Sequence, residues 1–255
     1  MSNRTEDLPT RTHPNAALPR SSRPSPGHWS MRSASLTAGA ALLLMSLLAI
    51  FGNVIVVDGL LTPGDAAQTA NDIDASQGLF RVGIASLILV VVLDVIVAWA
   101  LYRVFSPVSV SLSMLAAAMR LTYSAVFMVA IGQLVGVTRL LSDDNTRAAL
   151  GADQVNAHAI LGIAAFNDIW YVGQALFGAH LLLIGYLAYR SGYIPKVLGA
   201  LLVISGAGYA IDSLGAVLSQ SPWTDVSSVT FLGEFLLALW LVIRARRIAT
   251  SAPAI

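Results

Sequence analysis

A charge-free apolar run from Leu36 to Val57 constrains this chain more than any other feature. A membrane-crossing helix needs roughly 20 mostly apolar residues, and this run supplies that length. Further apolar runs follow along the 255 residues, of which only 11% are charged. Soluble domains carry about 25% charged residues, so this chain has too few charges to cover a surface in water. The sequence therefore predicts an integral membrane protein.

The apolar runs predict an all-α, polytopic integral membrane bundle of six transmembrane helices. The spans are placed at about 36–57, 80–104, 109–137, 168–189, 197–218 and 229–243, within one membrane domain from 33 to 247. Asn167 and Asp168 break the fourth run, so its membrane portion is placed from about 168 onward. Ahead of the second span, Thr62 as N-cap and Pro63 at the first helical position predict a short surface helix that ends near Ser76.

Two tails flank the predicted membrane domain. Residues 1–32 are polar and rich in Pro and Arg, and such a segment cannot bury enough apolar surface to fold alone. They predict a disordered tail rather than a cleaved signal, so the first span is expected to be retained. Residues 248–255 are assigned to a short C-terminal tail.

Most basic residues fall on one side of the predicted bundle. With six spans, both tails and the turns near Pro107 and Pro195 share a side, which holds 11 of the 15 Lys and Arg residues. The opposite loops hold only Arg139 and Arg147, with acids at positions 58, 65, 72, 74, 143, 144, 153 and 225. The positive-inside rule then predicts that both termini are cytoplasmic. A single lysine and abundant alanine suggest a GC-rich bacterial genome, so the predicted location is the bacterial cytoplasmic membrane.

Asp94 and Arg120 lie deep inside the second and third predicted spans. A helix rises about 1.5 Å per residue, so Asp94, nine residues before Arg103, is roughly 14 Å from the inner end of its span. Asp94 and Arg120 stand 13 residues on either side of Pro107. An antiparallel hairpin that turns at Pro107 therefore places both at one level.

His180 and Glu234 reach the same depth from the fourth and sixth spans. Each lies ten residues before an arginine, Arg190 or Arg244, and hence about 15 Å deep. A charged side chain at the bilayer centre costs at least ~2.5–3.5 kcal/mol, so such groups face the bundle interior and pair. We expect an ion pair between Asp94 and Arg120, with His180 and Glu234 as a second pair or as an extension of the first.

The remaining polar residues within the spans are secondary candidates. Asp212 lies sixteen residues after Lys196, nearer the outer face, where it caps or lines an outer cavity or else lies among lipid headgroups. Gln133 is a candidate for a hydrogen bond between helices. Gly199 and Gly206 on the fifth span suit close helix packing. The histidine spacing matches no metal site, no nucleophile motif or cofactor fingerprint occurs, and the arginines form no nucleic-acid-binding face.

Several motifs resemble one protein family. The run HLLLIGYLAYRSGYIPKVLGALLVISGAGYAIDS, preceded by LTPGDAAQTANDI and GLFRVG and followed by LGEFLLALW, is similar to the bacterial membrane family catalogued as domain of unknown function 4386. The resemblance extends from about Leu36 to Arg244. It implies a polytopic helical protein and supplies no mechanism.

Three functions remain open at this point. In the first, the protein binds or moves a small solute, a proton or a lipid at the layer formed by Asp94, Arg120, His180 and Glu234. In the second, it is a structural or regulatory membrane subunit, and the layer only stabilises the bundle. The third, weaker alternative is an intramembrane lipid-modifying enzyme. The expected partners are the lipid bilayer and a small-molecule or lipid ligand, and the oligomeric state stays open.

Overall fold

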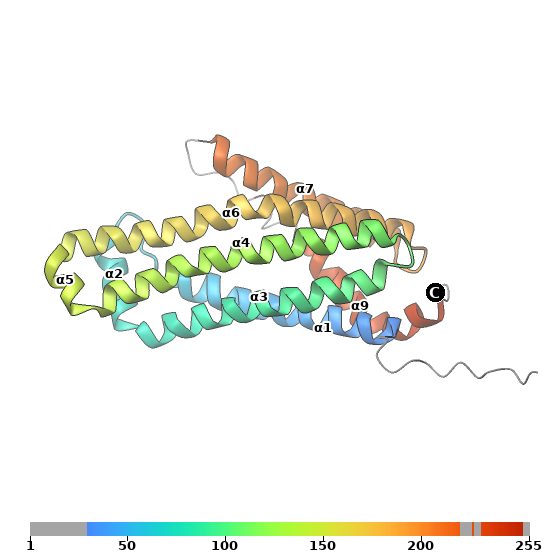
Figure 1. The fold of residues 1–255 in the computed structure, drawn as a ribbon, viewed down its shortest axis with the longest axis horizontal. Coiled ribbons are helices and arrows are strands. Elements are labelled where there is room, and N and C mark those ends of the chain that lie inside the picture. Colours follow the sequence, from blue (N-terminus) through green and yellow to red (C-terminus); the bar gives the residue numbers. More distant parts are fainter. Residues whose placement is uncertain (1–29, 220–225, 227–230, 252–255) are drawn as a thin grey trace, which may run out of the picture.

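A computed structural model describes residues 30–219, 226 and 231–251. Within these residues the chain forms helices and turns and no strand, which confirms the all-α expectation (Figure 1). In chain order they are α1 (Met31–Ala49), a π-helical continuation (Ile50–Val57), a 3-10 turn (Asp58–Leu60), α2 (Ala66–Ala75), α3 (Gln77–Phe105), α4 (Val110–Ser142), α5 (Asp144–Leu150), α6 (Ala152–Arg190), α7 (Lys196–Leu218) and α9 (Leu232–Ser251).

Five helical segments in the described part of the chain are long and apolar enough to cross a membrane. They are Met31–Leu60, α3, α4, α6 and α7, so a bundle of several spans is confirmed in this coarser form. The helix that contains the fourth expected span, 168–189, is α6, and it begins earlier, at Ala152. Asp168 does not end the helix, since its side chain lies on an exposed face.

α9 stands apart from these five segments. The sixth span was expected at about 229–243, but the helix begins at Leu232, and positions 229 and 230 lie outside the described residues. Its apolar part, Leu232–Ile243, has a length of only about 18 Å, against a hydrocarbon core of about 30 Å. Accordingly, α9 covers only the half of the bundle that contains the α3–α4 and α6–α7 turns (Figure 1).

The structure moves the borders of both tails. α1 begins at Met31 with Ser30 as N-cap, so Arg32 is helical rather than part of the N-terminal tail. α9 continues to Ser251, into the segment assigned to the C-terminal tail. The other tail residues, 1–29 and 252–255, lie outside the described residues.

The N-cap of the short surface helix also differs from the expectation. Asp65 caps α2, with its carboxylate accepting a hydrogen bond from the Gln68 N–H at 2.8 Å. Thr62 instead donates its backbone N–H to Thr69 Oγ1 at 2.9 Å. The helix therefore begins three residues later than predicted, because an aspartate three positions on satisfies its free N–H groups.

Exposed apolar side chains form a belt around one part of the bundle. On α4 the large exposed hydrophobic residues fall between Val110 and Val129. These twenty residues cover ~30 Å of helix, the thickness of the hydrocarbon core. On α6 such residues fall between Val172 and Tyr189, with Leu161 as an exception. We call this band the apolar belt, and it is where lipid would surround the bundle.

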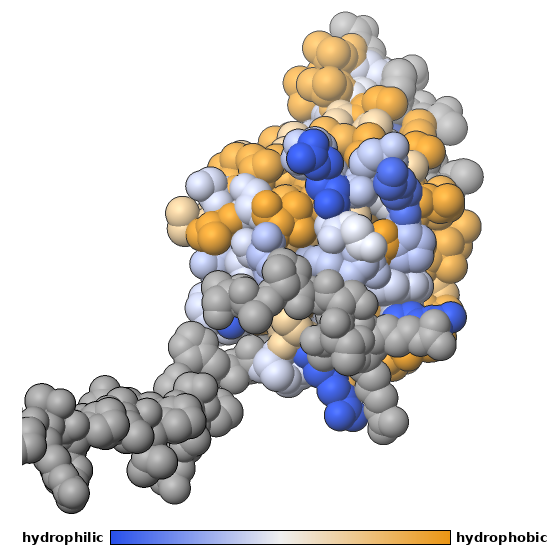
Figure 2. All heavy atoms as spheres, turned by 90° about the vertical axis from the view of Figure 1, so that its right-hand side faces the viewer, coloured by the Kyte–Doolittle hydropathy of each residue, from blue (hydrophilic) through white to orange (hydrophobic). Residues whose placement is uncertain are grey.

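The two ends of the bundle differ. The near end carries the start of α1, the end of α9 and the short α3–α4 and α6–α7 turns (Figure 1). Figure 2 views this end, where strongly hydrophilic residues project from the face and hydrophobic residues lie along its upper and lateral edges. The far end carries α2, α5 and the parts of α4 and α6 that lie beyond the apolar belt.

Glycines bring α6 and α7 into backbone contact. A Cβ atom on Gly178 would lie 2.6 Å from the Gly206 carbonyl oxygen, and one on Gly185 would lie 2.8 Å from the Gly199 carbonyl oxygen. Any larger side chain would push the helices apart. The role in close packing predicted for Gly199 and Gly206 is thereby confirmed, and this packing sets how α6 presents its other face to α4.

Candidate functional site

Arg120 occupies the middle of the apolar belt. It lies ten residues after Val110 and nine before Val129, so about 15 Å separates it from either edge. Only 1% of its side chain is exposed. A guanidinium in this position needs hydrogen-bonding partners, because neither water nor lipid can satisfy it.

Asp94 on α3 is its nearest acidic partner. Arg120 donates from Nε to Asp94 Oδ1 at 2.7 Å, and its Nη2 lies 2.6 Å from the same oxygen. The Ser124 hydroxyl, one turn further along α4, lies 3.1 Å from the other carboxylate oxygen. Asp94 is also 1% exposed, so the pair is fully enclosed by protein.

His180 on α6 reaches the same guanidinium. Its Nδ1 lies 2.8 Å from the carbonyl oxygen of Ala116, and its Nε2 lies 3.2 Å from Arg120 Nη1. A carbonyl can only accept, so Nδ1 carries the proton, and Nε2 accepts from the guanidinium. These partners define a neutral imidazole. Phe177, on the same helix, adds a ring face 5.2 Å from Arg120 Cζ, a cation–π contact.

Glu234 completes the group from α9. Its Oε1 accepts from Arg120 Nη1 at 3.2 Å. The residue lies in the first turn of α9, where the helix dipole favours a negative charge. Its side chain is 19% exposed, whereas those of Asp94 and Arg120 are 1% exposed. Glu234 is therefore the acid of this group that reaches the surface.

The structure thus places Asp94, Arg120, His180 and Glu234 in one layer, called here the Arg120 layer. His180 and Glu234 both meet Arg120 Nη1, so the contacts describe an extension of the first pair rather than a separate second pair. With both carboxylates ionised and the imidazole neutral, the layer carries one negative charge in excess. Chemically, such a layer can hold one proton or one additional cation.

Sequence reasoning missed the partners that complete the layer. Ser124 could have been found, because a residue four positions after Arg120 lies on the same helix face. The Ala116 carbonyl could not, since only the packing of α6 against α4 brings His180 to that oxygen.

Two buried polar atoms, one on the near-end side of the layer and one on the far-end side, have no hydrogen-bond partner among the described residues. Ser113 Oγ lies seven residues before Arg120, about 10 Å toward the near end. Gln174 Oε1 lies six residues before His180, about 9 Å toward the far end. Buried polar atoms of this kind are normally satisfied by ordered water.

The secondary candidates lie elsewhere. Asp212 is 1% exposed and its Oδ1 accepts the Val226 N–H at 2.9 Å, so its side chain is enclosed by protein. Gln133 lies thirteen residues beyond Arg120, about 20 Å away along α4. There it lines a hollow of ≈ 470 Å³ with Gly136 and His158. Neither belongs to the Arg120 layer.

Metal binding finds no support in the described part of the chain. No group of three His, Asp or Glu side chains there could hold a metal ion, and the sequence contains no cysteine.

Comparisons with known proteins give a family and no activity. The sequence model of the family described as "Domain of unknown function (DUF4386)" matches residues 37–245. An uncharacterized protein of Archaeoglobus fulgidus is 36% identical over 166 residues, which cover 65% of this chain and 85% of that protein. No solved structure matches this chain.

Proposed function

This chain belongs to the DUF4386 family, a domain of unknown function, and from the geometry of its Arg120 layer we propose that it takes up and releases a proton at the middle of the membrane. Proton exchange would serve the movement of that proton or of a small solute across the bundle. The proposal is independent of the family's description, which names no activity.

The observation that carries the proposal is the charge count of the layer. Asp94 and Glu234 share the single guanidinium of Arg120, and His180 is held neutral by the Ala116 carbonyl. A net charge in a low-dielectric layer is costly, so neutrality requires one carboxyl proton. We assign this proton to Glu234, because it is less enclosed by protein than Asp94, with 19% of its side chain exposed against 1%.

The flanking polar atoms support the proposal, because each is a place where water could approach the layer. Ser113 Oγ and Gln174 Oε1 lie on opposite sides of it along the bundle axis, about 10 Å and 9 Å away. Water at these atoms would connect the layer toward both ends. Protonation of Glu234 would also weaken its bond to Arg120, which is the contact that holds the start of α9 against α4.

The proposed topology follows from α9. We infer that α9 is a sixth membrane helix of half length, which enters from the near end and stops at the Arg120 layer. The near end then faces the cytoplasm with both termini, in agreement with its excess of basic residues. A bacterial cytoplasmic membrane is the proposed location.

The test uses the full chain reconstituted in liposomes with a pH-sensitive dye inside. Glu234→Gln keeps an oxygen that accepts from Arg120 but removes the exchangeable proton. We expect an imposed pH gradient to collapse faster with the wild type than in protein-free liposomes, and Glu234→Gln to abolish this difference. Asp153→Asn, an exposed acid at the far end of α6, is the matched control and should behave as wild type.

A spectroscopic measurement makes the assignment specific. Infrared difference spectra between acidic and neutral pH should show a protonated-carboxyl band that disappears in Glu234→Gln and persists in Asp153→Asn. Wild-type kinetics in Glu234→Gln, or no acceleration by the wild type, would contradict the proposal.

One observation favours a second candidate, a structural or regulatory subunit. Each nitrogen of Arg120, both oxygens of Asp94 and both nitrogens of His180 have partners within the protein. Such a satisfied network can serve simply to join α3, α4, α6 and α9. In that case Glu234→Gln changes the stability of the bundle, and neither the dye signal nor the carboxyl band depends on Glu234.

A further inference from the structure

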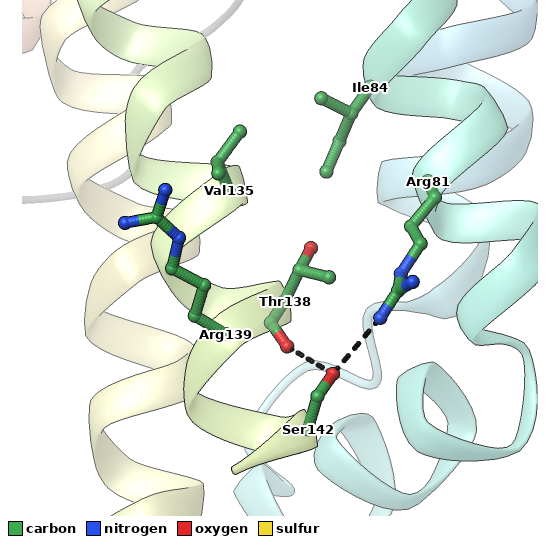
Figure 3. A pocket seen from close by; sticks show the side chains of 6 residues that line it. All are labelled: Arg81, Ile84, Val135, Thr138, Arg139 and Ser142. Atoms are coloured by element: carbon green, nitrogen blue, oxygen red, sulfur yellow. Dashed lines mark hydrogen bonds between the residues drawn. The ribbon is translucent and has the colours of Figure 1, made fainter.

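A second charged feature lies at the far end, between α3 and α4. It is a hollow of ≈ 300 Å³, open to the surface and shown in Figure 3. Two arginines, two hydroxyl residues and two aliphatic residues line it: Arg81 and Ile84 from α3, with Val135, Thr138, Arg139 and Ser142 from α4. None of them belongs to the Arg120 layer, so this hollow is a separate feature.

The depth of the hollow places it where lipid headgroups would lie. Asp94 and Arg120 mark the middle of the apolar belt, and Arg81 lies thirteen residues from Asp94, or about 20 Å along α3. On α3 the large exposed hydrophobic residues run from Leu79 to Trp99, so Arg81 lies at the far edge of the lipid-facing part of this helix. Lipid headgroups lie at the edge of the hydrocarbon core.

Arg81 and Arg139 take part in no ion pair among the described residues, where the recorded pairs involve Arg120 and Arg147. Arg147 of the same end pairs with Asp74 at 3.4 Å. Asp143, next to Arg139, accepts hydrogen bonds from the Asn145 N–H and the Thr146 hydroxyl, and the latter lowers its pKa. Neither of these two nearby acids therefore forms an ion pair with an arginine of the hollow.

Figure 3 shows how the arginines lie. Arg81 extends from α3 toward α4, where its Nη2 lies 3.3 Å from the Ser142 hydroxyl. That hydroxyl donates to the Thr138 carbonyl oxygen at 2.6 Å, so a neutral group holds Arg81 in place. Arg139 lies at the rim with its guanidinium directed away from Ser142. Arg81 is thus the principal cation of the hollow.

An apolar wall accompanies this charge. Ile84 and Val135 line the part of the hollow nearer the apolar belt. Leu79 and Val82, adjacent to Arg81 on α3, are 43% and 57% exposed. A ligand that suits the site therefore combines an oxyanion with hydrocarbon. Arginine binds phosphate oxygens in a bidentate manner, and membrane phospholipids carry both parts.

We propose that this hollow binds the phosphate-bearing headgroup of an anionic phospholipid. Arg81 holds the phosphate, Arg139 approaches it from the rim, and the acyl chains lie along the aliphatic side chains of α3. The site would anchor the far end of the α3–α4 hairpin to one leaflet of the membrane.

The test measures binding of phosphatidylglycerol to the purified full chain in neutral detergent, by native mass spectrometry and by the shift in melting temperature. Phosphatidylcholine and inorganic phosphate are the comparison ligands. We expect phosphatidylglycerol to bind and stabilise the wild type more than either. Arg81→Gln should weaken binding about fivefold, equivalent to about 1 kcal/mol per arginine near an anionic surface.

Arg139→Gln should have a smaller effect, in keeping with its place at the rim, and the double variant the largest. Arg147→Gln is the matched control, because it removes a far-end arginine that is paired with Asp74 and does not line the hollow. Equal binding of phosphatidylglycerol by the wild type and the double variant would overturn the proposal. So would equal binding of phosphatidylcholine. If inorganic phosphate alone stabilised the protein and this effect depended on Arg81, the lipid proposal would be wrong, and the ligand would be a free oxyanion.

Discussion

Replacing Arg120 with methionine removes the centre of the buried layer while keeping an unbranched side chain at the position. Asp94 is then left 1% exposed, with the Ser124 hydroxyl as its remaining partner in the layer. Removing one partner of a buried ion pair costs about 3–5 kcal/mol, because the other charge stays buried without compensation. We expect Arg120→Met to lower the free energy of unfolding by that amount.

The measurement is a double-mutant cycle with Asp94→Asn, by reversible unfolding in mixed detergent micelles. Neutralising Asp94 removes the uncompensated charge, so the double variant should be more stable than the sum of the single effects predicts. For residues in direct contact, a coupling of about 0.5–3 kcal/mol is typical. Arg147→Gln serves as the control, since its pair with Asp74 is 44% and 35% exposed and should contribute less than about 1 kcal/mol.

Additivity would refute this reasoning. If the costs of Arg120→Met and Asp94→Asn add within ~0.5 kcal/mol, the two side chains do not interact directly. A loss for Arg120→Met as small as that for Arg147→Gln would refute the burial argument as well.

Two further predictions concern packing and the near-end turn. Gly206→Ala should destabilise the bundle by about 1–3 kcal/mol, because its Cβ would lie 2.7 Å from the Gly178 carbonyl oxygen. Gly132→Ala should instead stabilise the bundle by about 0.5–1 kcal/mol, since a Cβ at that helical position meets nothing within 4 Å. Melting temperatures of the two variants test this pair. A higher melting temperature for Gly206→Ala than for Gly132→Ala would contradict the α6–α7 contact. Tyr193→Phe should cost about 0.5–1.5 kcal/mol, because the Tyr193 hydroxyl donates to the Val104 carbonyl oxygen at 2.6 Å. Equal unfolding free energies of Tyr193→Phe and wild type would show that this bond does not stabilise the α6–α7 turn.

The boundaries of several elements could be predicted only in part. The membrane portion of the fourth span is placed at about 168–189 from the sequence, and the helix that carries it, α6, extends back to Ala152. Hydropathy marks where lipid can surround a helix and does not mark where the helix ends. The polar first part of α6 is stable outside the apolar belt because Val155, Ala159 and Ile163 are buried there against the rest of the far end.

Depth along the membrane is the property that the sequence by itself determined. The rise per residue of a helix is nearly constant, so counting from Pro107, Arg190 and Arg244 placed four ionisable residues at one level. Local chemistry suffices for that result, since hydrogen bonds within each helix set its rise.

Only the tertiary structure decided which groups meet at that level. The direction of each side chain around its helix depends on contacts between distant segments, such as the glycine contacts that set α6 against α7. These contacts bring His180 and Glu234 to Arg120 Nη1 rather than to one another. Packing likewise leaves Glu234 partly exposed and Arg81 beside a hydroxyl instead of a carboxylate. No spacing in the sequence encodes these angles, because each results from the whole bundle.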